Sequence, residues 1–158
     1  MIKKTLSALL IMIIVLQFIQ PQHNNGPELT PTDITHVVPV PDDVMAILKT
    51  SCYDCHSNHT NYPWYSRITP VNWWLNFHIT EGKRELNFSD FANYSYKKKS
   101  LMLDETAKEV DKLMMPLPSY LWVHKDAKLD DAHRKLLIDW TKNAKLELMK
   151  VTLQKSIH

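Results

Sequence analysis

The segment Cys52-Tyr53-Asp54-Cys55-His56 holds the only two cysteines of the chain, three positions apart, with a histidine directly after the second. Two thiols at this spacing can each form a thioether bond to a vinyl group of one haem, and the imidazole that follows can bind the iron. The C-x-x-C-H motif therefore predicts a covalently attached c-type haem. Cys52 and Cys55 are the expected attachment points, and His56 is the expected proximal axial ligand.

Two other uses of these residues stay open from the motif alone. A redox-active dithiol would place C-x-x-C at the start of a helix in a βαβ unit, and no strand pattern surrounds the motif. A zinc site is the closer rival, because His59 follows His56 by three residues and completes a set of four possible ligands. Structural zinc sites usually split their ligands between two separated pairs, so a zinc-stabilised binding module is the weaker alternative.

The rest of the composition favours helices over sheets. Glycine occurs 2 times and proline 9 times in 158 residues, so tight turns are scarce and stiff connections are frequent. The apolar spacing predicts an all-α domain over residues 41–150, with a C-terminal tail over 151–158. Four helices are expected: from Asp42 to the motif, from an N-cap at Thr69 to Gly82, over 100–113, and from Asp130 onward. No internal repeat is present, so we expect one haem.

The N-terminal residues 1–20 are typical of an export segment. Lys3 and Lys4 precede an apolar run from Leu6 to Ile19, which predicts that the lysines stay on the cytoplasmic side. No small-x-small cleavage site follows, so we expect an uncleaved membrane anchor rather than a removed signal peptide, although the run is short for a spanning helix. The polar, proline-rich residues 21–40 are expected to be a linker that leaves the domain on the periplasmic side.

Charge excludes one class of partner. The formal net charge of +2 equals the contribution of Lys3 and Lys4, because the other 17 basic residues balance the 17 acidic ones. A neutral domain gives no reason to expect nucleic acid as a partner. Redox partner proteins are expected, and the sequence does not identify them.

A second axial ligand is expected downstream of the motif. Met115 precedes Pro116, which pushes its backbone out of the helical region and frees its side chain to point into a cleft. A thioether opposite imidazole raises the potential of the iron, as in electron carriers. His78 is the alternative and would give a lower potential. The neighbouring Met114 has the spacing of a core residue with Leu103.

The haem propionates need donors, and several residues could supply them. Arg67 is the first candidate, because it follows an aromatic pair in a proline-bounded loop, and Lys83 and Arg84 are alternatives. Trp73 and Trp74 cannot both face the core from one helix, so one of them, expected to be Trp74, can reach the porphyrin edge or a propionate through its indole nitrogen.

A series of short motifs in order resembles the bacterial haem-binding domain family, over about Pro41 to Trp140. The motifs are Cys52-Tyr53-Asp54-Cys55-His56-Ser57-Asn58, Tyr62-Pro63-Trp64-Tyr65, Trp73-Trp74, His78, Glu81-Gly82-Lys83, Leu86-Asn87-Phe88-Ser89, Met115-Pro116, and His124 through Leu129. The resemblance implies a cytochrome c-like helical domain around one covalent haem, attached outside the cytoplasm. His78 belongs to the pattern, which keeps it open as an iron ligand.

These features predict a haem protein that transfers single electrons at the outer face of the cytoplasmic membrane. The alternative is a haem-based sensor or haem enzyme with an open sixth position. We do not expect an enzyme, because no convincing distal pairing of histidine with arginine is visible, although Arg67 and His78 could still meet in space.

Overall fold

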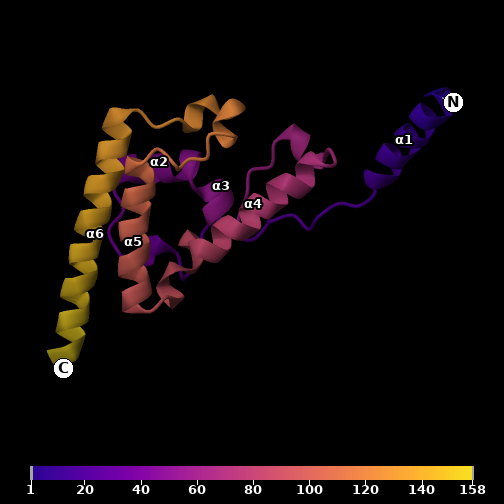
Figure 1. Ribbon diagram of the computed structural model, residues 1–158. Coiled ribbons are helices and arrows are strands. Elements are labelled where there is room, and N and C mark those ends of the chain that lie inside the picture. The colour runs from indigo at the N-terminus through magenta and orange to yellow at the C-terminus, as the bar shows by residue number, and fades with distance from the viewer. Residues whose placement is uncertain (1, 158) are drawn as a thin grey trace.

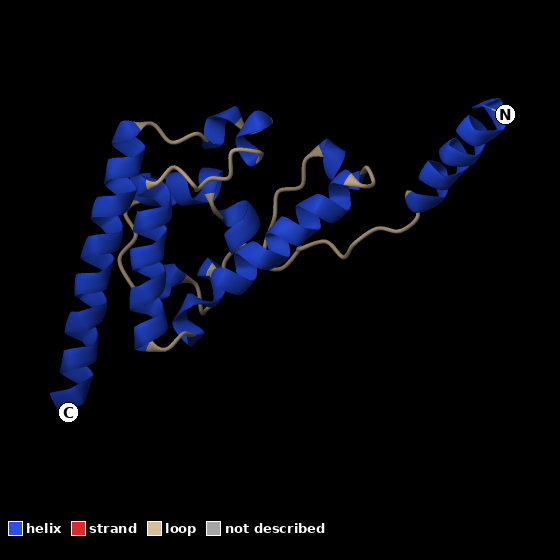
Figure 2. Ribbon diagram, viewed as in Figure 1, coloured by secondary structure: helices blue, strands red, loops and turns tan. Residues whose placement is uncertain are grey.

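A computed structural model describes residues 2–157, and the helices in that range are α-helices and 3-10 helices, joined by turns and loops (Figure 2). The α-helices are α1 (Ile2–Leu16), α2 (Asp42–Ser51), α3 (Tyr53–His56), α4 (Val71–Glu85), α5 (Tyr96–Asp111) and α6 (Asp131–Ile157). The 3-10 turns are η1 (Ile34–His36), η2 (Trp64–Arg67), η3 (Phe88–Asn93), η4 (Tyr120–Trp122) and η5 (Lys125–Ala127). The prediction of an all-α domain is confirmed.

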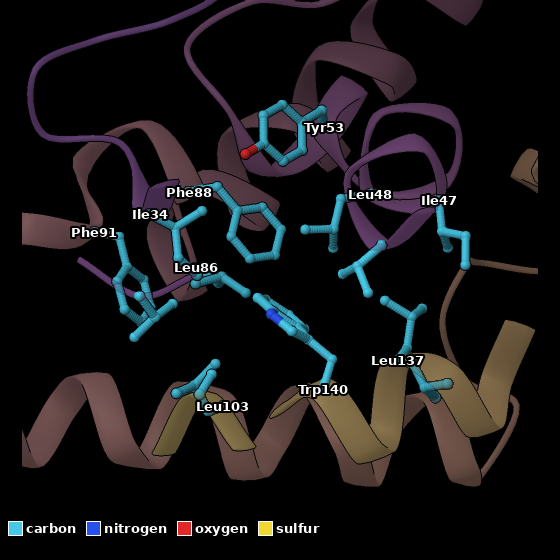
Figure 3. Close-up of a cluster of buried hydrophobic side chains, with 14 of the residues drawn as sticks. Ile34, Ile47, Leu48, Tyr53, Leu86, Phe88, Phe91, Leu103, Leu137 and Trp140 are labelled. Carbon is cyan, nitrogen blue, oxygen red and sulfur yellow. The ribbon is translucent and has the colours of Figure 1, made fainter. Parts of the chain in front are cut away.

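The core lies between the α5–α6 pair and the segments around α2. Helices α5 and α6 lie side by side and run in opposite directions, and α2 crosses near the start of α6 (Figure 1). The side chains that fill this space are almost fully buried: Ile34, Leu48, Phe88, Phe91, Leu103 and Leu137 (Figure 3). Burial of each such side chain contributes about 1.5–3 kcal/mol. The core thus holds α2 firmly at the point where it leads into Cys52.

Helix α4 differs from its predicted bounds at both ends. Its N-cap is Pro70, and Thr69 instead accepts a hydrogen bond at Oγ1 from Nδ2 of Asn72, at 3.0 Å. Gly82 does not end the helix, which continues to Glu85. A Cβ atom at Gly82 would lie 2.8 Å from the carbonyl oxygen of Cys55, so the glycine serves a close approach of α4 to α3.

The two C-terminal helices also extend beyond the prediction. Helix α5 starts at Tyr96, because the Ser95 hydroxyl accepts a hydrogen bond from the Lys98 amide at 3.3 Å and caps the helix. Helix α6 runs to Ile157 and includes most of the predicted tail. The assignment of Met114 to the core is wrong, since its side chain is 53% exposed beyond the end of α5.

The predicted linker, residues 21–40, is packed into the domain rather than extended from it. Ile34 and Val38 belong to the core, and the Trp140 indole donates a hydrogen bond to the Pro39 carbonyl at 3.0 Å. The Asn24 carbonyl accepts a hydrogen bond from the Thr60 amide, also at 3.0 Å. The folded unit therefore starts well before Pro41.

Helix α1 has 15 residues, a length of about 22 Å, and none of its residues is buried. Among residues 2–157, no helix combines the length and the apolar character that are needed to cross a membrane, so the predicted spanning anchor is not supported. The chain just after α1 is nevertheless attached to the domain. Gln17 and Thr69 exchange two hydrogen bonds, of 3.0 and 3.2 Å, between the Gln17 side chain and the Thr69 backbone.

Candidate functional site

The two cysteines and the histidine of the motif lie on one tight turn. Cys52 ends α2, Cys55 and His56 lie in α3, and the His56 amide donates a hydrogen bond to the Cys52 carbonyl at 2.9 Å. All three residues line a cavity of about 260 Å³. Both cysteines are unbridged, and burial raises the pKa of each thiol to about 12. A redox dithiol needs a lowered thiol pKa, so this environment does not fit that use.

The imidazole of His56 has a defined orientation. Its Nδ1 atom lies 2.9 Å from the Leu86 carbonyl oxygen, which can only accept, so Nδ1 carries the proton and Nε2 keeps its lone pair. Burial lowers the pKa of His56, which keeps the ring neutral. A neutral imidazole whose second nitrogen bonds a backbone carbonyl is the usual state of a metal-binding histidine.

The segment after α4 supports this turn from the core side. The Asn87 side chain donates a hydrogen bond from Nδ2 to Oδ1 of Asn58 at 2.9 Å, and the Asn58 amide donates to the Ser89 hydroxyl at 3.1 Å. Phe88 stacks on Tyr53 with ring centroids 5.2 Å apart and meets His56 edge-on at 6.4 Å. The residues around His56 are thereby fixed on both sides.

Both candidates for the second axial position reach the same cavity. Met115 lines it from the connection after α5, and His78 lines it from α4. The Met115 amide donates a hydrogen bond to the Glu109 carbonyl at 3.2 Å, which anchors its backbone to the end of α5. The structure therefore brings His56, Met115 and His78 together from three separate parts of the chain.

A second cavity of about 490 Å³ adjoins the first. The two cavities share Cys55, His78, Leu117 and Tyr120 as lining residues. Trp64, Val71, Trp74, Trp122 and Val123 contribute most of the remaining apolar wall. Cofactor pockets in proteins have volumes of roughly 300–1,000 Å³ and mostly apolar linings, which the adjoining pair matches.

The loop that carries Met115 is held by aromatic side chains against the turn from Cys52 to His56, which we call the attachment turn after its proposed role. The Tyr120 hydroxyl donates a hydrogen bond to the Asp54 carboxylate at 2.7 Å, and burial, together with Asp54, raises the pKa of Tyr120. His124 stacks on Tyr120 with a centroid distance of 4.1 Å, and its Nε2 lies 2.7 Å from the Tyr65 hydroxyl.

A family model described as a haem-binding domain matches residues 11–143. The chain belongs to the haem-binding domain family. The match includes every residue that lines the two cavities, and it confirms the resemblance found in the sequence. No curated protein and no solved structure gives a significant match.

The predicted propionate donors Arg67, Lys83 and Arg84 do not line either of the two cavities. Arg67 is exposed and lines a different cavity, together with His59, so the pairing of Arg67 with His78 does not form. Lys83 donates a hydrogen bond to the Asn24 side chain at 2.6 Å, and Arg84 pairs with acidic neighbours on α4. No lysine or arginine is among the described residues that line the first and second cavities.

The tryptophans separate as expected from their adjacent positions on α4. Trp74 lines the second cavity, whereas the Trp73 indole donates a hydrogen bond to the Ile19 carbonyl at 2.9 Å. Of these two tryptophans, only Trp74 lines a cavity next to the C-x-x-C-H motif, and its contact with a haem stays a prediction.

The zinc alternative is not supported. Nδ1 of His59 lies 2.9 Å from the carbonyl oxygen of Gly26, which can only accept, so Nδ1 donates a hydrogen bond to it. His59 lines a different cavity from the one that Cys52, Cys55 and His56 line. Within residues 2–157, no three or more His, Cys, Asp or Glu side chains converge to hold a metal ion.

Several contacts at this site were missed by the sequence reasoning. The role of Leu86 depends on its backbone carbonyl, which leaves no trace in residue type. Asn87 carried a weak signal, because an amide that is buried between Leu86 and Phe88 needs a partner. His124 belongs to the family motifs, but its contact with Tyr65 spans 59 positions and no local pattern signals it.

Proposed function

We propose that this haem-binding domain attaches one haem covalently and carries single electrons. The observation that supports the proposal is the convergence of Cys52, Cys55, His56 and Met115 on one apolar cavity. When bound, the haem supplies one-electron redox chemistry at its iron.

Cys52 and Cys55 would form the covalent attachment. Each thiol adds across one vinyl double bond: a sulfur–carbon bond forms, the thiol hydrogen goes to the other vinyl carbon, and no electron is gained or lost. The rigid turn and its support by Asn58 and Asn87 hold the two sulfur atoms and His56 in one arrangement.

His56 would be the proximal ligand and Met115 the distal one. The hydrogen bond from His56 to Leu86 fixes the ring and raises its basicity as a ligand. Met115 is favoured over His78, because the His78 ring already packs against the rings of Trp74 and Phe77. A thioether ligand would give the high potential of an electron carrier.

We further propose export of the domain to the outer face of the cytoplasmic membrane, where redox proteins would be its partners. The support is the N-terminal sequence, with two lysines ahead of an apolar run. A second support is the proposed covalent attachment, which in the haem-binding domain family takes place outside the cytoplasm.

The test is expression with a haem-attachment system, followed by a haem stain after denaturing electrophoresis. Only thioether-linked haem stays on the unfolded chain, so we expect a stained band at the mass of this protein. A folded protein that binds haem but loses the stain on denaturation would contradict the covalent proposal and leave only haem binding.

A second candidate function is a sensor or enzyme with a displaceable sixth ligand. It is favoured by the exposure of the Met115 loop, in which Leu113 and Met114 are largely exposed and Met115 is half-buried. Carbon monoxide distinguishes the two. Slow, partial binding to the reduced protein is expected of a six-coordinate carrier, and fast, complete binding is expected of the sensor.

A further inference from the structure

Charged residues are distributed very unevenly along the chain. Residues 5–27, 61–80 and 113–124 contain none of the 17 acidic residues and only Arg67 among the 19 lysines and arginines. A segment-wide lack of charge is unusual on the surface of a soluble domain, where charged residues normally cover the exposed face.

Residues 61–80 and 113–124 supply every residue that lines the second cavity except Cys55, and residues 17–20 bond to the start of α4 next to it. We name the five exposed apolar residues that line the second cavity the tryptophan rim: Trp64, Val71, Trp74, Trp122 and Val123. Trp64 and Trp122 are 79% and 76% exposed, so their rings stand out from the surface. A contiguous exposed apolar patch of this kind marks an interaction surface.

The end of α1 is fastened beside this rim. Gln17 bonds Thr69, Ile19 accepts from the Trp73 indole, and Gln20 accepts from Nδ2 of Asn72 at 2.8 Å, all at the start of α4. Figure 1 shows α1 extending from this end of the molecule, away from α5 and α6.

Helix α1 is itself apolar on every side. The seven consecutive residues from Leu9 to Val15 are each at least 44% exposed, and seven residues cover all directions around a helix. A helix that is apolar all round needs an apolar environment, either a protein core or lipid. Within the described chain no protein segment covers it.

We propose that the tryptophan rim lies in the interface of a lipid bilayer, so that the open side of the haem cavity faces the membrane. Tryptophan is enriched at this depth, because its ring is apolar and its indole N–H is polar. A redox protein is the less suitable occupant, since transient electron-transfer docking relies on complementary charges, which this face lacks. The inference does not depend on covalent haem attachment.

Vesicle binding of the full-length, haem-loaded protein tests the proposal. The double variant Trp64→Ser/Trp122→Ser is compared with the wild type and with Leu101→Ser/Leu146→Ser. The latter removes two exposed leucines of α5 and α6 and is the matched control. Sedimentation with neutral phosphatidylcholine vesicles measures the partition coefficient, and hydrogen exchange measures amide protection with and without vesicles.

We expect the rim variant to partition about tenfold more weakly than the wild type, and the control variant to stay within about twofold. Vesicles should slow amide exchange over 64–67 and 120–123 and leave 97–101 unchanged. Equal partitioning of the rim variant and wild type would overturn the proposal. So would binding that requires anionic lipid and disappears in salt, or a rim-dependent dimer in the absence of vesicles. A haem stain of the pelleted protein reports attachment separately.

Discussion

The two sides of the candidate haem site are built in different ways. On the side of His56, the attachment turn is held by buried residues, by the Leu86 carbonyl and by the contact of α3 with Gly82. On the side of Met115, an exposed connection is held mainly by the Tyr120–Asp54 hydrogen bond and by stacking of His124. The difference indicates that His56 and the two cysteines, the proposed first ligand and tethers, are structurally fixed, whereas Met115, the proposed second ligand, lies on a loop that can adjust.

The largest effect is expected from removal of both tethers. In Cys52→Ala/Cys55→Ala, no thioether bond can form, so the haem stain after denaturation should disappear completely. His59→Ala, which alters the same loop without touching the cavity, should keep the stain. Staining of the double variant would show that the attachment turn has no covalent role.

The distal side is tested by its two candidate ligands. In Met115→Ala, the weak near-infrared band of a sulfur–iron bond should vanish, and the reduction potential should fall by on the order of 0.1 V, because the thioether no longer stabilises ferrous iron. His78→Ala should keep the band. Survival of the band in Met115→Ala would show that another sulfur binds the iron and that the assignment of Met115 is wrong. A bis-histidine spectrum in the wild type that is lost in His78→Ala would assign His78 instead.

The fixed side is tested by its closest backbone contact. Gly82→Ala would place a methyl group 2.8 Å from the Cys55 carbonyl oxygen, which α4 can relieve only by moving away from α3. We expect the free energy of unfolding to fall by about 1–3 kcal/mol in denaturant titrations. Thr80→Ala, at an exposed position of the same helix, should be neutral or slightly stabilising. Unchanged stability of Gly82→Ala would mean that the approach of the two helices is not tight.

The smallest effect is expected from removal of the Tyr120–Asp54 hydrogen bond, which holds the loop that carries Met115. Tyr120→Phe removes the hydrogen bond to Asp54 and keeps the ring that stacks on His124, so unfolding should become easier by about 1 kcal/mol. Carbon monoxide should bind the reduced variant faster than the wild type, because the Met115 loop is freer to open. Tyr96→Phe, at an exposed position, is the control and should change neither quantity.

Much of the architecture could be predicted from local patterns. The all-α class, the helix that leads into Cys52, and the reach of both Met115 and His78 to the motif all follow from periodicity, proline position and spacing. The errors occur where distant contacts decide. Gly82 lies inside α4, where its lack of a side chain lets Cys55 approach closely. Residues 21–40 pack onto the domain, with Ile34 buried in the core, and the exposed Arg67 lines a different cavity.

The sequence by itself determined the chemistry of the attachment turn, since two thiols and an imidazole within five residues need no tertiary contact to be adjacent. Only the tertiary structure decided the state of that imidazole, through a backbone carbonyl 30 positions away, and the meeting of residues 61–80 with residues 113–124 at one cavity. The physical reason is that hydrogen bonds of the main chain and the packing of surfaces depend on position in space, which residue type alone does not encode.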